Sequence, residues 1–125
     1  MTEDNHDTLI AAVRDASAKW IAAFNAGDAD GCTAAYEKDA VMNAEPFGTF
    51  TGHKQIHAFW TKLIESGFTG VEYVDPKIEI VDPQSAILSS DWRMNNAQGV
   101  ITKELWVLQP DGTVLLREDD FEALG

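Results

Sequence analysis

The last two predicted strands carry the side chains best suited to acid–base chemistry. Because side chains alternate between the faces of a strand, Glu104 shares a face with Trp106, and Arg117, Asp119 and Phe121 share a face of the next strand. Carboxyl groups can donate or accept protons, and an arginine can orient a carbonyl or carboxylate group. Two hypotheses stay open: Arg117 orients a substrate, or it neutralises both acids and leaves an inert cluster.

Two histidines, His53 and His57, have the spacing by which one helical face presents two metal ligands. A third ligand is missing, because His6 falls in a predicted N-terminal tail and Cys32 on a different helix. We therefore predict no metal site and no cofactor. His53 stays a candidate at the border of a ligand pocket, as a neutral acid–base partner.

Asp91 and Trp92 are neighbours in a predicted strand and must face opposite sides of it. If Asp91 faces inward, it adds a further carboxylate to a pocket. If Trp92 faces inward, it adds an aromatic floor. The sequence pattern does not decide between these orientations.

Three predicted helices in the first half of the chain position part of these residues. Apolar residues recur at helical spacing over residues 9–24, with Asp7 as N-cap, which leaves residues 1–6 as a flexible tail. Asp28 is expected to cap a short second helix. A third helix is predicted from about residue 52 to residue 67, where a glycine ends it.

The second half of the chain changes to the alternation that is typical of strands. Strands are predicted at residues 40–43, 71–81, 85–94, 99–109 and 114–121. Asp75-Pro76 indicates a break in the second of them, and Pro110-Asp111-Gly112 predicts the last hairpin. Helices followed by a strand meander predict an α+β fold, with helices on one face of an antiparallel sheet.

Composition excludes several classes of function. The chain has 125 residues, enough for one domain (1–125), and 9 Lys and Arg against 21 Asp and Glu, a net charge of −12. Without a basic cluster, nucleic acid and anionic membranes are not expected partners. No apolar run reaches the roughly 20 residues of a membrane span. The acidic first residues differ from a signal peptide and Cys32 stands alone, so we expect a cytoplasmic protein.

Two segments carry a resemblance to a known superfamily. They are WIAAFNAGDADG at residues 20–31, and residues 39–60, which include PFG at 46–48 and end in GHKQIHAFW. Through them nearly the whole chain resembles the nuclear transport factor 2-like superfamily, on the side of ketosteroid isomerases and SnoaL-like polyketide cyclases. The resemblance implies three N-terminal helices packed on a strongly curved antiparallel sheet, a cone with an internal pocket. Isomerases, cyclases, dehydratases, hydrolases and binding domains all share this fold, so function needs separate evidence.

The resemblance also implies roles for single residues. It turns the faces of Glu104, Arg117 and Asp119 toward the pocket, and the isomerase acid at the position of Glu104 donates a hydrogen bond to a developing enolate. The alternative for Glu104 is a structural ion pair with an arginine. The position of the isomerase general base falls on Ala44, or on Glu45 after a shift of one residue. Glu45 is either a base at the pocket mouth or, as the turn favours, an exposed residue.

The tyrosine that ketosteroid isomerases carry on the first helix is replaced by Trp20, whose indole N–H can donate but never accept a hydrogen bond. Core packing is therefore the favoured role of Trp20, with substrate contact as the alternative. Because the general base is doubtful and the tyrosine is missing, we do not expect steroid isomerase activity. The remaining candidates for substrate contact are aromatic: Trp60, Trp106 and Phe121.

These observations lead to one functional expectation and its alternative. We expect a cofactor-independent acid–base enzyme of isomerase, cyclase or dehydratase type, with Glu104 and Asp119 as acid and base and an apolar, carbonyl-containing metabolite as substrate. The alternative is a non-catalytic ligand-binding or dimerisation domain of the same fold. Ile101, Leu105 and Val107 form an apolar patch on the other sheet face, which predicts a homodimer formed sheet to sheet, as the resemblance also implies.

Overall fold

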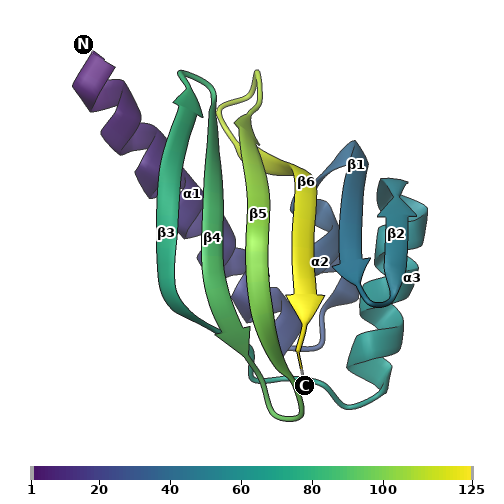
Figure 1. Ribbon diagram of the computed structural model, residues 1–125. Coiled ribbons are helices and arrows are strands. Elements are labelled where there is room, and N and C mark those ends of the chain that lie inside the picture. Colours follow the sequence, from purple (N-terminus) through teal and green to yellow (C-terminus); the bar gives the residue numbers. More distant parts are fainter. Residues whose placement is uncertain (1, 125) are drawn as a thin grey trace.

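The computed structural model describes the backbone of residues 2–124 and the side chains of residues 7–124 (Figure 1). Helices on one face of a six-stranded sheet make up the fold, as the α+β expectation required. The helices are α1 (Thr2–Asn25), α2 (Ala29–Ala34) and α3 (Gly52–Glu65). In the described part of the chain, none of them is long and apolar enough to span a membrane.

The strands follow the order β2-β1-β6-β5-β4-β3 across the sheet. They are β1 (Tyr36–Glu45), β2 (Gly48–Thr51), β3 (Glu72–Asp82), β4 (Ser85–Arg93), β5 (Gln98–Leu108) and β6 (Val114–Ala123). Strand β1 pairs with β6 in parallel and every other described pair is antiparallel, so the sheet is mixed. The expectation of a purely antiparallel sheet was wrong at this pair, because alternation along a strand carries no information about the direction of a distant partner.

The helix ends show which local predictions held. Helix α1 begins at Thr2, so Asp7 lies inside it, and residues 2–6 are helical where a tail was expected; Met1 lies outside the described residues. Asp28 caps α2 as predicted, since its side chain accepts a hydrogen bond of 2.9 Å from the Gly31 N–H. Gly67 follows α3 with a φ of 94°, a left-handed conformation that favours glycine.

Two strands differ from their predicted extent. Strand β1 is longer than predicted, because it begins at Tyr36 and not at residue 40. The four-residue strand β2 was not predicted at all. The predicted break at Asp75-Pro76 is confirmed, since the pairing of β3 with β4 shifts there and Asp75 has a φ of 55°.

Two β-bulges between β5 and β6 decide which side chains face the helices. Thr102 is an extra residue on β5, and Arg117 is an extra residue on β6. Each extra residue reverses the alternation beyond it. Ile101, expected on the outer face, therefore lies inside and is 4% exposed, whereas Arg117, expected inside, faces outward and is exposed.

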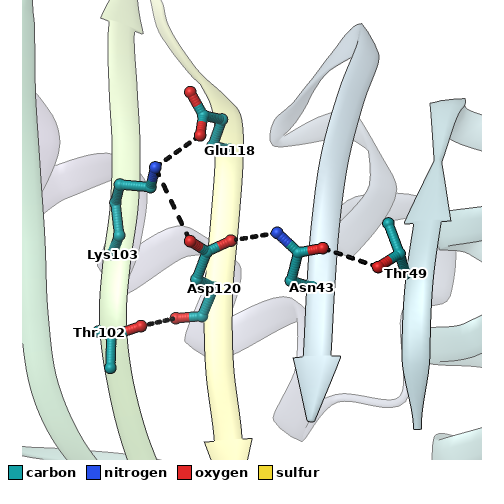
Figure 2. Close-up of polar contacts among 6 residues, drawn as sticks. All are labelled: Asn43, Thr49, Thr102, Lys103, Glu118 and Asp120. Atoms are coloured by element: carbon teal, nitrogen blue, oxygen red, sulfur yellow. Dashed lines mark hydrogen bonds and ion pairs between the residues drawn. The ribbon is translucent and has the colours of Figure 1, made fainter.

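The outer sheet face is polar at its centre (Figure 2). Lys103 donates to Glu118 over 2.6 Å, and its ammonium lies 3.7 Å from the carboxylate of Asp120. The Asn43 amide donates to Asp120 over 2.7 Å and accepts from Thr49 over 2.8 Å. This row of contacts links four neighbouring strands on the face away from the helices.

Candidate functional site

An apolar pocket lies between the helices and the inner face of the sheet. It has about 80 Å³ of free space, enough for several water molecules. Half of its eighteen lining residues are aromatic, and no Lys, Arg or His lies among them. Phe47 of the β1–β2 turn, Ala97 of the β4–β5 turn and Ala123 near the C-terminus line one end, where these segments meet at the lower end of the sheet in Figure 1.

Two acidic side chains line this apolar pocket. Glu104 on β5 and Asp119 on β6 are directly opposite each other in the antiparallel pair. Opposite residues on such strands have Cβ atoms roughly 5 Å apart, so the two carboxyl groups interact strongly. They are 3% and 4% exposed, and within the described residues neither forms an ion pair with a cation.

Glu104 accepts hydrogen bonds at both carboxyl oxygens. The Tyr73 hydroxyl donates to Oε2 over 2.7 Å, and the Trp106 indole N–H donates to Oε1 over 3.0 Å. Burial raises the pKa of Glu104 to about 7, because an anion loses its hydration there, and the two hydrogen bonds partly oppose this rise. Glu104 therefore changes its charge near neutral pH.

Asp119 has a single donor. The Tyr36 hydroxyl donates to its Oδ2 atom over 2.6 Å. Burial raises the pKa of Asp119 well above its usual range, and the adjacent negative charge of Glu104 raises it further, whereas the bond from Tyr36 opposes the rise. Because Glu104 has two donors and Asp119 one, we expect the first negative charge of the pair on Glu104, while Asp119 keeps its proton.

Three indole N–H groups of the pocket side chains have no hydrogen-bond partner among the described residues: those of Trp20, Trp60 and Trp92. The positive end of the Trp60 N–H group lowers the pKa of Tyr36, but this group and the Tyr36 hydroxyl do not form a hydrogen bond. A buried donor without an acceptor costs about 1–3 kcal/mol. An oxygen atom of a bound molecule can remove this cost.

Comparison with known proteins adds the family. A profile of the SnoaL-like domain matches residues 18–117, four fifths of the chain. The chain belongs to the SnoaL-like domain family. No curated protein matches it.

Solved structures share the fold of this SnoaL-like domain at low sequence identity. A putative scytalone dehydratase from Novosphingobium aromaticivorans is similar with a TM-score of 0.82 and 14% identity, covering 98% of this chain and 89% of that chain. A ketosteroid isomerase-like protein from Erwinia carotovora atroseptica has a TM-score of 0.79 and 15% identity, and the match covers 92% of this chain and 95% of that chain. An NTF-2 like protein of unknown function from Shewanella oneidensis has a TM-score of 0.78 and 16% identity, and the match covers 90% of this chain and 98% of that chain. The profile match confirms the SnoaL-like resemblance, and these structural likenesses confirm the predicted fold.

Arg117 lies outside the pocket of this SnoaL-like domain. Its guanidinium binds the Glu37 carboxylate through two hydrogen bonds of 2.7 and 3.1 Å, and its side chain is 55% exposed. The bulge at Arg117 is the physical reason, because it turns this side chain to the outer face. Both hypotheses that placed Arg117 against the two acids are therefore wrong.

Three further candidates also lie away from the pocket. Asp91 is exposed, and its neighbour Trp92 is the residue that faces inward, which settles the open question of their orientation. Glu45 is exposed at the end of β1, as the turn favoured. His53 lies 2.8 Å from the backbone carbonyl of Tyr36 through its Nε2 atom and does not line the pocket.

The two histidines considered as metal ligands, His53 and His57, bind different partners. His57, one turn from His53 on α3, has its Nε2 atom 2.7 Å from a carboxylate oxygen of Asp30. Within the described residues, no group of three or more His, Cys, Asp or Glu side chains is arranged to hold a metal ion.

The aromatic candidates divide between two positions. Trp20, Trp60 and Phe121 line the pocket, whereas Trp106 is buried behind Glu104 and acts on it as a hydrogen-bond donor. Sequence reasoning missed Tyr36 and Tyr73, the only tyrosines of the chain, although each binds one of the two acids.

Proposed function

We propose that this SnoaL-like domain is a cofactor-independent acid–base enzyme of isomerase, cyclase or dehydratase type that acts on an apolar, carbonyl-containing metabolite. One observation carries the proposal: two carboxyl groups face each other in an apolar pocket, and no cation of the described side chains lies beside them. Such a pair holds one group ionised and one protonated near neutral pH, as acid–base catalysis requires.

The geometry supports a division of roles between the acids. The Glu104 carboxylate takes a proton from the carbon next to the substrate carbonyl, and the protonated Asp119 donates a hydrogen bond to the carbonyl oxygen, which becomes an enolate. Glu104 then returns the proton to the same or another carbon. Tyr73 and Trp106 position Glu104, and Tyr36 positions Asp119.

Hydrogen–deuterium exchange tests this proposal without knowledge of the natural substrate. Small cyclic ketones, enones and amino ketones are incubated with the protein in D₂O, and deuterium at the α-carbon is followed by NMR. We expect faster exchange for at least one probe and a loss of roughly 100-fold or more in Glu104→Gln, because general bases contribute about that much. Glu79→Gln makes the same change at an exposed position of β3 and serves as the control.

Two outcomes contradict the proposal. If Glu104→Gln exchanges the probes as fast as the unchanged protein, Glu104 is not the base. If no probe exchanges although probes bind and raise the melting temperature, the domain is a ligand-binding module of this fold.

We also propose that the protein is a cytoplasmic homodimer that uses the outer sheet face. Ile87, Leu105 and Val41 stand in neighbouring register positions of β4, β5 and β1 on that face, with Glu118 between the last two. All four are half-buried in the single chain. The three apolar side chains stand at neighbouring register positions, beside the polar row of Figure 2 to which Glu118 belongs, and such a mixed surface suits a contact between two copies.

A further inference from the structure

We propose that the pocket binds a small organic cation, an amine or quaternary ammonium compound that also carries a hydroxyl or carbonyl oxygen. The proposal rests on the proposed function in one respect, because it specifies that the carbonyl-containing substrate carries a positive charge. It concerns recognition by the pocket, which can be measured apart from catalysis.

The charges around the pocket favour a cationic ligand. Glu104 and Asp119 are the titratable acids that line it, and no basic side chain does so within the described residues. The nearest sheet cations in the register, Lys103 and Arg117, belong to the outer face, where they pair with other carboxylates. A buried carboxyl group without a counter-ion ionises more readily when a ligand brings the positive charge.

The pocket walls favour the same ligand. Aromatic ring faces attract a cation that lies within roughly 6 Å of the ring centre. Trp60 has its ring centre 4.9 Å from that of Trp20 in an edge-on arrangement, and it stacks on Phe121 at 5.9 Å. Rings set at different angles around one space present several faces to its contents, which suits the round shape of a substituted ammonium group.

The unpartnered indole groups explain why the ligand also needs an oxygen. An indole N–H is a donor only, and an ammonium group accepts no hydrogen bond. The N–H groups of Trp20 and Trp92 lack any partner among the described residues. A hydroxyl or carbonyl oxygen on the ligand provides the missing acceptor.

Binding of such a cation is coupled to proton release. The titratable groups facing the two acids are Tyr73 from β3 and Tyr36 from β1, neither of which supplies a positive charge. Asp120 lies on the outer face of β6, and its negative charge adds to the rise in the pKa of Asp119. A bound cation favours the ionised form of Glu104, so a proton leaves this carboxyl group when the cation binds, whereas Asp119 keeps its proton. The affinity therefore rises as the pH increases through about 7, the pKa of Glu104, and falls at lower pH.

Calorimetry with matched probes tests the proposal on the full chain. Choline and 3,3-dimethylbutan-1-ol have the same shape and hydroxyl group, but only choline carries the charge. Titrations at pH 7 in two buffers with different ionisation heats give both affinity and proton release. We expect choline to bind at least about tenfold more tightly, with release of up to one proton that the neutral alcohol does not cause. Tetramethylammonium, which lacks the oxygen, should bind more weakly than choline.

The outcomes separate this proposal from the proposed function. Equal affinity for the two isosteres, or choline binding without proton release, overturns the cation proposal. Exchange of neutral ketones that Glu104→Gln abolishes then still supports the enzyme. Conversely, choline binding with proton release supports the cation site even if no ketone exchanges.

A pair of variants locates the effect. Glu104→Gln should lose most of the choline affinity and the proton release, whereas Glu79→Gln, which removes the same charge from an exposed position, should retain both. If both variants lose affinity equally, the cation is attracted by the overall negative charge and the proposal fails. Circular dichroism checks that Glu104→Gln is folded. If the variant is not folded, the comparison of choline with 3,3-dimethylbutan-1-ol in the unchanged protein decides whether the cation proposal holds.

Discussion

Hydrogen-bond donors set the difference between the two buried acids. Glu104 and Asp119 have almost the same exposure, yet Glu104 accepts from two side chains and Asp119 from one. A hydrogen bond to a carboxylate stabilises its anion and lowers its pKa. The number of donors therefore indicates which of the two carboxyl groups ionises first, although their burial is almost the same.

The buried Glu104 predicts a pH-dependent stability. Its pKa in the folded protein is raised from 4.5 to about 7, so the folded state holds the proton more tightly than the unfolded chain. The contribution of Glu104 to the free energy of unfolding is therefore largest below pH 4.5. About 3 kcal/mol of it is lost as the pH rises from 4.5 through 7. Urea unfolding at several pH values should show this loss in the unchanged protein and a flatter profile in Glu104→Gln. A profile as steep in the variant would contradict the assignment.

A second prediction concerns the donor Tyr73. Tyr73→Phe removes the 2.7 Å hydrogen bond to Glu104, which stabilises its anion. Hydrogen bonds to charged groups contribute about 1.5–3 kcal/mol, so the pKa of Glu104 should rise by roughly one to two units. Carboxyl carbon NMR titration measures this shift directly. An unchanged pKa would show that the tyrosine has only a packing role.

The sequence identified the acids but not their partners. The resemblance turned Glu104 toward the pocket, and alternation gave it the same face as Trp106 because the extra residue of the nearby bulge, Arg117, stands on β6. Tyr36 and Tyr73 were missed because their hydrogen bonds join residues 83 and 31 positions apart. Alternation within one strand holds no information about contacts at such distances.

At the level of the elements, the bulges account for the main errors in side-chain orientation. Ile101 and Arg117 were both assigned to the wrong face, and each stands at or beside an extra residue in the pairing of β5 with β6. A bulge at Thr102 or Arg117 has no glycine or proline to mark it in the sequence. Strand positions, by contrast, were predicted well wherever turns such as Pro110-Asp111-Gly112 bound them.

Gly99 is a position where the sheet needs the absence of a side chain. A Cβ atom there would lie 1.9 Å from the Glu122 carbonyl oxygen and 2.6 Å from a ring carbon of Trp92. Gly99→Ala should therefore lower the free energy of unfolding by more than about 2 kcal/mol and displace Trp92 from the pocket. Urea unfolding and tryptophan fluorescence measure the two effects. The exposed neighbour Gln98→Ala is the control, and equal effects of both variants would refute the prediction.

At the level of the whole molecule, the proposed dimer makes a clear prediction. Leu105→Lys places a long charged side chain beside the apolar Ile87 and the carboxylate of Glu118 on the outer sheet face, and burying that charge in a contact between two copies is costly. Light scattering after gel filtration should give twice the 13.7 kDa chain mass for the unchanged protein and the single chain mass for the variant. Leu124→Lys, at an exposed position outside the strands, is the control. A monomer in both the unchanged protein and the variant would exclude the dimer.

The central place of β6 has a consequence for biosynthesis. Strand β6 is the last to leave the ribosome, yet it lies between β1 and β5 and carries Asp119. Until it arrives, the nascent chain has two unpaired strand edges and cannot hold the acid pair. The contact of Tyr36 with Asp119 also joins residues 83 positions apart, so the pocket can form only after β6 has been synthesised.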